Sequence, residues 1–290
     1  MSEETGKNGK GIIAFQGARG ANSDMACHLV YPEMEVLPCH SFEDTFAAVR
    51  NGHAELAMIP IDNSRAGRVA DNHHLLPDSG LHIVGEHYQR IRHHLLAPKG
   101  ATMETIKRVH SHVHAIGQSR NLIREHGFEA LVAADTAGAA AEVAEKNSIE
   151  DAAIAPPLAA ELYNLETLAT DVQDTDDNTT RFVIMAREPI DPDPAESTVV
   201  TTFVFRVRSV PAALYKALGG FATNGVNITK LESYITDGSF AVAQFYADIE
   251  GHPDDRMVRL ALEELSFFSK EVKILGVYPA SPFRKQVAAQ

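Results

Sequence analysis

The stretch DTDDNTTRF, residues 174 to 182, brings acids, an amide, three threonines and an arginine together. Its first, third and fifth residues are acid, acid and amide, as in a calcium-binding loop. Such a loop also needs a glycine next and a bidentate acid at its end, whereas this sequence has Thr179 and Met185 there. Calcium binding is therefore disfavoured, and the sequence predicts no metal ligand.

The second half of the stretch indicates anion chemistry instead. The apolar run RFVIMA follows, so a polar loop is expected to lead into a strand. Thr179, Thr180 and Arg181 then place hydroxyls and a guanidinium at the start of that strand. Such groups are suited to an anionic ligand, although a solvated turn explains the neighbouring acids equally well.

A second candidate is GARGANSD, residues 17 to 24, which follows a strand and opens a helix. The free N–H groups of a helix N-terminus favour an anion. The stretch lacks the ending of a phosphate loop and the glycine spacing of a dinucleotide fingerprint. Two interpretations of this stretch are possible: an anion-binding site, or a tight turn with Ser23 as the helix cap.

A third candidate is IPIDNSRAG, residues 59 to 67, where Asp62, Asn63 and Ser64 end a strand. It is either a capped turn or a polar ligand-binding loop.

The stretch VHSHVH, residues 109 to 114, alternates in a way that predicts three histidines on one strand face: His110, His112 and His114. Three histidines could hold zinc, but no further ligand is visible. A His-rich sheet edge is the favoured interpretation.

The elements before residue 187 alternate between strands and helices, which predicts an α/β domain. Ligands of open α/β sheets bind at the carboxyl ends of strands, where the stretches above fall. Strands are expected at 11–17, 54–61, 151–156 and 181–186, and helices at 23–32, 41–52, 117–127, 136–147 and 157–164; residues 102–112 are expected to run from a helix into a strand.

Residues 187 to 198, REPIDPDPAEST, are rich in proline and acids and predict a linker. The elements after it follow the order β-α-β-β-α-β, a ferredoxin-like arrangement with a hairpin turn at Asp237-Gly238.

The 290 residues are enough for two domains, and a hydrophobic content of 44% is ordinary for a globular protein. The net charge of −13 argues against nucleic acid or an anionic membrane as partner. The polar N-terminus is not a secretory signal, no apolar membrane span is present, and two cysteines suit a reducing compartment. We therefore expect a cytoplasmic protein.

With these stretches in order, the chain resembles the prephenate dehydratases, from Ile12 to about Tyr278. NTTRF matches the family's Thr-Arg-Phe signature. IPIDNSRAG resembles its Pro-x-Glu-Asn-Ser loop, with Asp62 in place of Glu, and SHVHAIGQS resembles its Ser-His-Pro-x-x-x-x-Gln-Cys segment, with Val113 and Ser119 in place of Pro and Cys. GARGANS resembles its Gly-Pro-x-Gly-x-x-Ser loop, with Ala18 in place of Pro.

The resemblance implies catalytic and substrate-binding residues. The catalytic ones are Thr180, Ser111, Gln118 and Asn63. The substrate-binding ones are Arg181, Phe182, Ser23, Asp62, Ser64 and Thr179. The implied reaction turns prephenate into phenylpyruvate, water and carbon dioxide, without a metal or organic cofactor.

The part after the linker resembles an ACT domain, an amino-acid-sensing module. VPAALYKALGGF resembles its Pro-Gly-Ala-Leu helix start, with Ala212 in place of Gly, and VNITKLES resembles its Asn-Leu-Thr-x-Ile-Glu-Ser strand, followed by Tyr234-Ile235 in place of Arg-Pro. The implied phenylalanine site comprises Pro211, Ala212, Ala213, Leu214, Asn227, Glu232 and Ser233.

The implied fold is a two-lobed, periplasmic-binding-protein-like α/β catalytic domain followed by a ferredoxin-like ACT domain. The expected boundaries are 11–188 for the catalytic domain, with lobes of about 11–80 plus 180–188 and 81–179, and 198–280 for the ACT domain. ACT domains commonly pair, so the resemblance implies a homodimer or homotetramer.

Two other functions are open. One is a dehydratase that prefers arogenate, which has an amine in place of the keto group of prephenate. The other is a non-catalytic amino-acid sensor, against which Thr180, Arg181, Asn63 and Gln118 argue together. A transport-associated binding protein would need a signal sequence.

Overall fold

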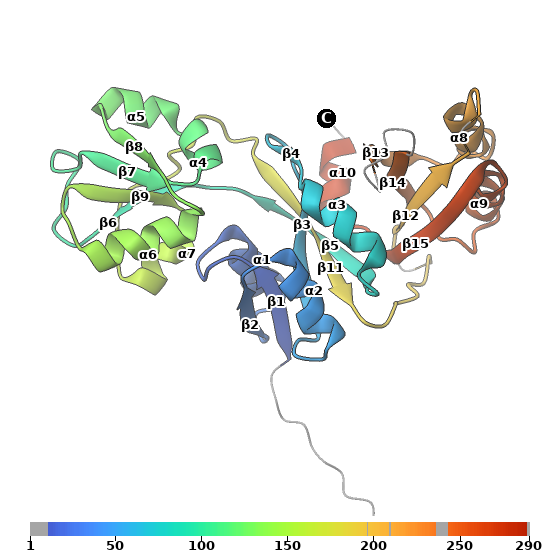
Figure 1. The fold of residues 1–290 in the computed structure, drawn as a ribbon, viewed down its shortest axis with the longest axis horizontal. Coiled ribbons are helices and arrows are strands. Elements are labelled where there is room, and N and C mark those ends of the chain that lie inside the picture. The colour runs from blue at the N-terminus through green and yellow to red at the C-terminus, as the bar shows by residue number, and fades with distance from the viewer. Residues whose placement is uncertain (1–10, 196, 209, 236–242, 289–290) are drawn as a thin grey trace, which may run out of the picture. The chain divides into compact units, whose positions relative to one another are not determined.

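The computed structural model describes residues 11–195, 197–208, 210–235 and 243–288 (Figure 1). The chain divides into two compact units. Unit 1 comprises Met1–Arg68 and Gln89–Phe182, and unit 2 comprises Val69–Tyr88 and Val183–Gln290. The expected turn at Asp237-Gly238 lies outside the described residues.

The first part of unit 1 is a parallel sheet with β1 between β2 and β3. The consecutive residues Ile13, Ala14 and Phe15 of β1 have no exposed surface, as expected of a strand covered on both faces. The elements are β1 (Ile12–Gln16), α1 (Asn22–Val30), β2 (Glu35–Cys39), α2 (Phe42–Arg50), β3 (Leu56–Asn63) and β4 (Gly67–Arg68).

Helix α2 begins as the sequence predicts, because the Ser41 side chain accepts a hydrogen bond from Asp44 N at 3.1 Å. Helix α1 differs from the expectation. Its N-cap is Ala21, so Ser23 lies inside the first turn, and Asp24 Oδ2 accepts a hydrogen bond from Gly20 N at 2.7 Å. The expected Ser23 cap is therefore wrong.

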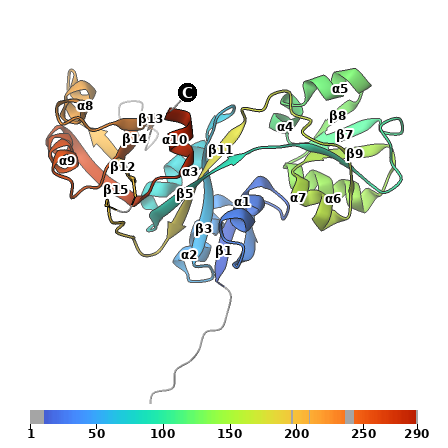
Figure 2. The ribbon, with the colours of Figure 1, turned by 180° about the vertical axis from the view of Figure 1, so that it is seen from behind.

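The second part of unit 1 is a five-stranded sheet in the order β10-β6-β9-β7-β8, covered by helices on both faces (Figure 2). Leu95 packs with α4 and α5 on one face, and its neighbour Leu96 packs with α6 and α7 on the other. The elements are β6 (His94–Ala97), β7 (Arg108–Ser111), α4 (Val113–Gly117), α5 (Arg120–His126), β8 (Glu129–Val132), α6 (Thr136–Lys146), β9 (Asp151–Ala155), α7 (Pro157–Tyr163) and β10 (Glu166–Ala169).

Two expectations for residues 102–114 are wrong. Residues 102–107 form no helix, because Thr102 and Thr105 close a turn through Thr105 N to Thr102 O and Thr102 N to Thr105 Oγ1. The expected histidine strand also fails, because β7 ends at Ser111 and His112 is the N-cap of α4.

Two long strands, β5 (His82–Arg90) and β11 (Thr179–Ala186), each contribute residues to both units.

The ferredoxin-like part of unit 2 confirms the predicted β-α-β-β-α-β order. Its strands form an antiparallel sheet in the order β13-β14-β12-β15. Phe203, Phe221 and Leu265 belong to the core between this sheet and two helices. The elements are β12 (Val199–Val207), α8 (Ala213–Thr223), β13 (Ile228–Ile235), β14 (Ala243–Glu250), α9 (Arg256–Phe268) and β15 (Ser269–Pro279).

Segments from distant parts of the sequence complete unit 2. Strand β5 pairs with β15 in parallel at Ile83 and Gly276. The His73 ring packs edge-on against the Tyr246 ring of β14, with centroids 5.1 Å apart. The additional elements are α3 (Ala70–Leu75), the 3-10 helix η1 (Leu76–Asp78) and α10 (Phe283–Ala288).

A buried charge cluster holds the C-terminal segment in unit 2. Arg284 Nε and Nη2 lie 2.6 and 2.8 Å from the two carboxylate oxygens of Glu86, and Nη2 lies 3.4 Å from Asp248 Oδ2. Both carboxyl side chains are fully buried and Arg284 is 14% exposed. A bidentate guanidinium between two buried acids is a strong, directional link.

No helix in the described part of the chain has the length and apolar character needed to cross a membrane.

Candidate active site

A cluster of neutral amide and hydroxyl side chains lies in unit 1, where β3, α4 and β11 end or begin. Asn63 Nδ2 donates to Asn178 Oδ1 at 2.7 Å and to Thr180 Oγ1 at 2.9 Å. Asn178 Nδ2 donates to Gln118 Oε1 at 2.5 Å. We call Asn63, Gln118 and Asn178 the amide relay. It brings together three of the four predicted catalytic residues: Thr180, Asn63 and Gln118.

The loop after β3 fixes the orientation of Asn63. Its Oδ1 accepts hydrogen bonds from Arg65 N at 2.9 Å and Ala66 N at 2.8 Å. The oxygen therefore faces backbone donors, and the nitrogen faces the relay.

The predicted residues Ser64 and Thr179 join this loop to the start of β11. Ser64 N donates to Thr179 O, and Thr179 N donates to Ser64 Oγ, each at 2.9 Å. Ser64 Oγ also donates to Asp177 O at 2.8 Å, and the Arg65 guanidinium pairs with the Asp177 carboxylate. These bonds hold Thr180 beside Asn63.

The acids of residues 174–177 have structural partners. Asp174 accepts hydrogen bonds from Arg120 N at 3.1 Å and Asn121 N at 2.9 Å, so it caps the start of α5. Within the described residues, no group of three or more metal-binding side chains is present.

The start of β11 is buried: Thr180 is 8% exposed, Arg181 5% and Phe182 1%. Arg181 Nη1 lies 3.9 Å from Asp62 Oδ2. Because successive side chains of a strand point to opposite faces, the Arg181–Asp62 pair lies on the other face of β11 from the Thr180 hydroxyl, while Phe182 is a core residue.

His93 is a buried neighbour of Gln118 that the sequence did not reveal. Burial lowers the pKa of His93 to about 4, and a hydrogen bond to Gln118 acts in the opposite direction. The imidazole is therefore neutral near pH 7. Its backbone N donates to Gln173 Oε1 at 2.9 Å.

Two further predicted site residues, Ser111 and Ser23, have other surroundings in unit 1. Ser111 is fully buried and its Oγ donates to Ile154 O at 2.5 Å. Ser23 lies in the first turn of α1 and is half-buried.

His110 does not share the surroundings of His112 and His114, whose ring centroids lie 5.0 Å apart. His110 Nε2 lies 2.8 Å from Asp151 Oδ1, and Arg108 binds the same carboxylate at 2.8 and 2.9 Å. The Arg108 guanidinium holds the pKa of the Asp151 carboxyl far below its usual range. His112 and His114 lie at the start of α4. His110 therefore belongs to an ion-pair network.

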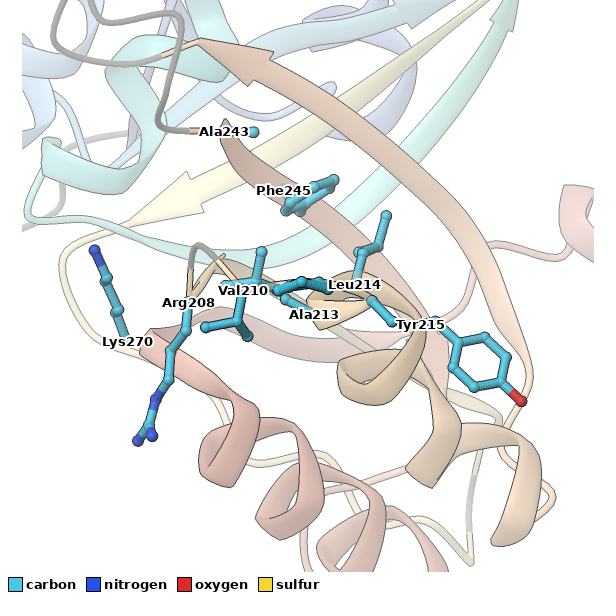
Figure 3. A pocket seen from close by; sticks show the side chains of 11 residues that line it. Arg208, Val210, Ala213, Leu214, Tyr215, Ala243, Phe245 and Lys270 are labelled. Atoms are coloured by element: carbon cyan, nitrogen blue, oxygen red, sulfur yellow. The ribbon is translucent and has the colours of Figure 1, made fainter.

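Apart from the polar cluster in unit 1, a pocket of about 520 Å³ lies in the ferredoxin-like part of unit 2. Phe245, Val210 and Leu214 give it an apolar side, whereas the Tyr215 ring points away (Figure 3). Arg208 and Lys270 add two cations to its lining. Four of the predicted phenylalanine-site residues line this pocket: Pro211, Ala212, Ala213 and Leu214.

The other three predicted phenylalanine-site residues are outside the lining. Asn227 Nδ2 donates to Glu250 Oε2 at 2.9 Å. Glu232 and Ser233 lie on β13, where Ser233 is opposite Phe245 of β14.

Ala212 stands where the ACT domains that this region resembles have glycine. Its backbone is left-handed, with φ 59° and ψ 22°. An L side chain in this region is strained, and glycine is not. We therefore expect Ala212→Gly to raise the free energy of unfolding by about 1 kcal/mol in urea denaturation. The neighbouring Ala213→Gly is the control, since a glycine in the first turn of α8 should lower stability. Equal destabilisation by both changes would contradict the strain at Ala212.

The fold and the polar cluster define a class: a two-lobed, periplasmic-binding-protein-like α/β protein with a ferredoxin-like domain after it. The family model for prephenate dehydratase matches residues 13–190. The chain belongs to the prephenate dehydratase family of carbon–oxygen lyases, in aromatic amino-acid biosynthesis.

Two relatives illustrate the range of the similarity. The chain is 53% identical to a bifunctional N-acyl-homoserine lactone acylase/prephenate dehydratase of Komagataeibacter europaeus, over 96% of this chain and 99% of that protein. It is 38% identical to arogenate dehydratase/prephenate dehydratase 2, chloroplastic, of Arabidopsis thaliana, over 96% of this chain and 75% of that protein.

Two solved structures share the fold. One, described as a novel type of quorum-quenching acylase, is 53% identical with a TM-score of 0.89, over 94% of this chain and 99% of that one. The other is a prephenate dehydratase from Arthrobacter aurescens in complex with L-Phe, 30% identical with a TM-score of 0.84, over 96% and 97%.

Proposed function

We propose that the chain converts prephenate into phenylpyruvate, water and carbon dioxide. Loss of the ring carboxylate as carbon dioxide sends an electron pair through the ring, and the hydroxyl on the opposite carbon leaves. One proton joins the departing hydroxyl to form water. The observation that carries this proposal is the buried Thr180 hydroxyl, oriented by Asn63 at 2.9 Å.

In this proposal Thr180 donates its O–H to the leaving hydroxyl. A threonine hydroxyl is a poor acid, so it acts through an oriented hydrogen bond rather than a matched pKa. Thr180 Oγ1 accepts the Asn63 hydrogen bond with a lone pair, which leaves its hydrogen available.

The remaining predicted residues bind and orient the dianion. Arg181, or backbone N–H groups near Ser23, holds one carboxylate. Gln118 provides a neutral group, which orients the substrate without adding a full positive charge at the departing carboxylate, whereas Asn63 acts through Thr180 and Ser111 remains a predicted member of the site. Catalysis requires the transition state to be bound more strongly than the substrate, and a strongly stabilised carboxylate would resist decarboxylation. Asp62, Ser64, Thr179 and Phe182 shape the surrounding loop and strand.

We also propose that phenylalanine regulates the enzyme through the ferredoxin-like domain, as an ACT domain. The pocket of about 520 Å³ offers apolar side chains for a phenyl ring and cations for a carboxylate. The solved relative in complex with L-Phe supports the same ligand. Asn227, Glu232 and Ser233 remain predicted members of this site.

The test is phenylpyruvate formation by the purified chain from prephenate, with and without phenylalanine, and a parallel reaction with arogenate. We expect turnover of prephenate and its suppression by phenylalanine. If phenylalanine leaves turnover unchanged, the regulatory proposal is wrong, whereas the proposed enzymatic activity stands. Faster turnover of arogenate would change the preferred substrate, and no turnover of either would overturn the proposed function.

A second candidate activity is hydrolysis of N-acyl-homoserine lactones. The observation that favours it is 53% identity with a relative named as a bifunctional acylase and dehydratase, across nearly the whole of both chains. Incubation with an N-acyl-homoserine lactone, followed by detection of the free fatty acid and homoserine lactone, tests it. Thr180→Ala separates the activities if acyl hydrolysis survives while prephenate turnover is lost.

The other features expected from the sequence remain proposals. These are a catalytic domain of 11–188, an ACT domain of 198–280, a cytoplasmic location and a homodimer or homotetramer.

A further inference from the structure

The hydrogen bonds of the amide relay have one consistent direction. Asn63 Oδ1 accepts from two backbone N–H groups, so Asn63 Nδ2 must donate to Asn178 and Thr180. Asn178 Oδ1 is then an acceptor, and its Nδ2 donates to Gln118 Oε1. The direction thus follows from backbone contacts and does not depend on a free choice of amide rotamers.

This direction decides which atoms the relay uses. The carbonyl oxygen of Gln118 accepts from Asn178, and the Gln118 side chain also hydrogen-bonds His93, so at least one of its two Nε2 hydrogens remains for the substrate. The oxygen of Thr180 accepts from Asn63, so its hydroxyl hydrogen also remains. Both groups can therefore act as donors.

We propose that Asn178 is a positioning residue that makes Gln118 and Thr180 hydrogen-bond donors toward the substrate. The inference rests on the proposed function and adds a residue that the family resemblance did not assign. Asn178 is 3% exposed, and its side chain joins Asn63 at the end of β3 to Gln118 at the end of α4. It reaches both because it directly precedes β11.

Asn178→Asp is the sharpest test, because it keeps the shape and replaces the donor with an acceptor. An ionised carboxylate would accept from Asn63 but could not donate to Gln118. Gln118 would then turn its Nε2 toward residue 178 and its oxygen toward the anionic substrate. We expect kcat to fall about 10²-fold at pH 8.

The same variant carries a pH signature that a purely structural role lacks. When the introduced carboxyl is protonated, it again donates to Gln118, so activity should recover as the pH falls. Wild-type enzyme should not show this recovery. The charged and titratable groups on the surrounding segments include Asp62, Arg65, His93, Arg120, Asp174, Asp176, Asp177 and Arg181, and all are retained in the variant.

Gln173→Glu is the matched control. It adds the same charge in the same loop, and its carboxylate can still accept the hydrogen bond from His93 N. The one bond it loses, from Gln173 Nε2 to Asp176 Oδ1, is long at 3.4 Å and exposed to solvent. We expect its pH profile to follow wild type. An N178D variant with wild-type kcat and pH profile, in an enzyme that turns over prephenate, would overturn the positioning role and leave the proposed function in place.

A second measurement does not depend on turnover or on a variant that must fold. Both Asn63 side-chain amide hydrogens are donated within the relay, so they should exchange slowly with water in wild-type protein. NMR of protein labelled at asparagine side chains measures this exchange. Rapid exchange of both hydrogens would overturn the inference. In Asn178→Ala, loss of one acceptor should speed the exchange of one hydrogen.

Discussion

Replacing Thr180 by alanine is expected to lower kcat on prephenate about 10²- to 10⁴-fold. The hydroxyl is the proposed donor to the leaving group. A water molecule that took its place would be held less firmly than a side chain on the buried start of β11. Because Asn63 binds the hydroxyl oxygen at 2.9 Å, its orientation is set before the substrate arrives. Steady-state phenylpyruvate formation at saturating prephenate measures the effect.

Two companion variants separate the lost hydroxyl from altered packing. Thr180→Val keeps the shape of the side chain and should be as impaired as alanine. Thr180→Ser keeps the hydroxyl and should retain most of the activity. Near-wild-type turnover by the alanine variant would remove Thr180 from the mechanism.

Replacing Arg284 by methionine is expected to lower the free energy of unfolding by about 3–5 kcal/mol. The change leaves two fully buried carboxylates, Glu86 and Asp248, without the guanidinium that binds both. Uncompensated buried charge costs far more than a surface ion pair contributes. Urea denaturation followed by circular dichroism measures the loss.

Lys285→Met is the control, since it removes an exposed cation from the same short helix. Its stability should lie within about 0.5 kcal/mol of wild type. Adding Glu86→Gln to Arg284→Met should restore part of the stability, because one of the two buried charges is then gone. Wild-type stability of Arg284→Met alone would contradict the proposed importance of this cluster.

The sequence predicted most elements that have a strong local signal. Helix α2 has its Ser41 cap, α5 ends at Gly127 with φ 65°, and the ferredoxin-like order appears in unit 2. It missed short strands such as β8 and β10, because four residues contain too little periodicity to distinguish them from loops. It also missed α10, whose position depends on Glu86 far away in the chain.

The candidate site was predictable in part. Residue types and the family resemblance indicated Thr180, Asn63 and Gln118, which lie in one cluster. Asn178 was visible only as an incomplete calcium ligand, since its partners lie 115 and 60 residues away. His93 gave no signal, because burial beside Gln118 is what distinguishes it from the other histidines.

The link between Glu86 and Arg284 spans 198 positions of the sequence. During synthesis from the N-terminus, Glu86 therefore emerges from the ribosome long before its guanidinium partner exists. Unit 2 can be completed only after Arg284 has been synthesised, whereas the segments of unit 1 are all present after Phe182. Residues 69–88 therefore wait for their partners in unit 2 through the synthesis of about two hundred residues.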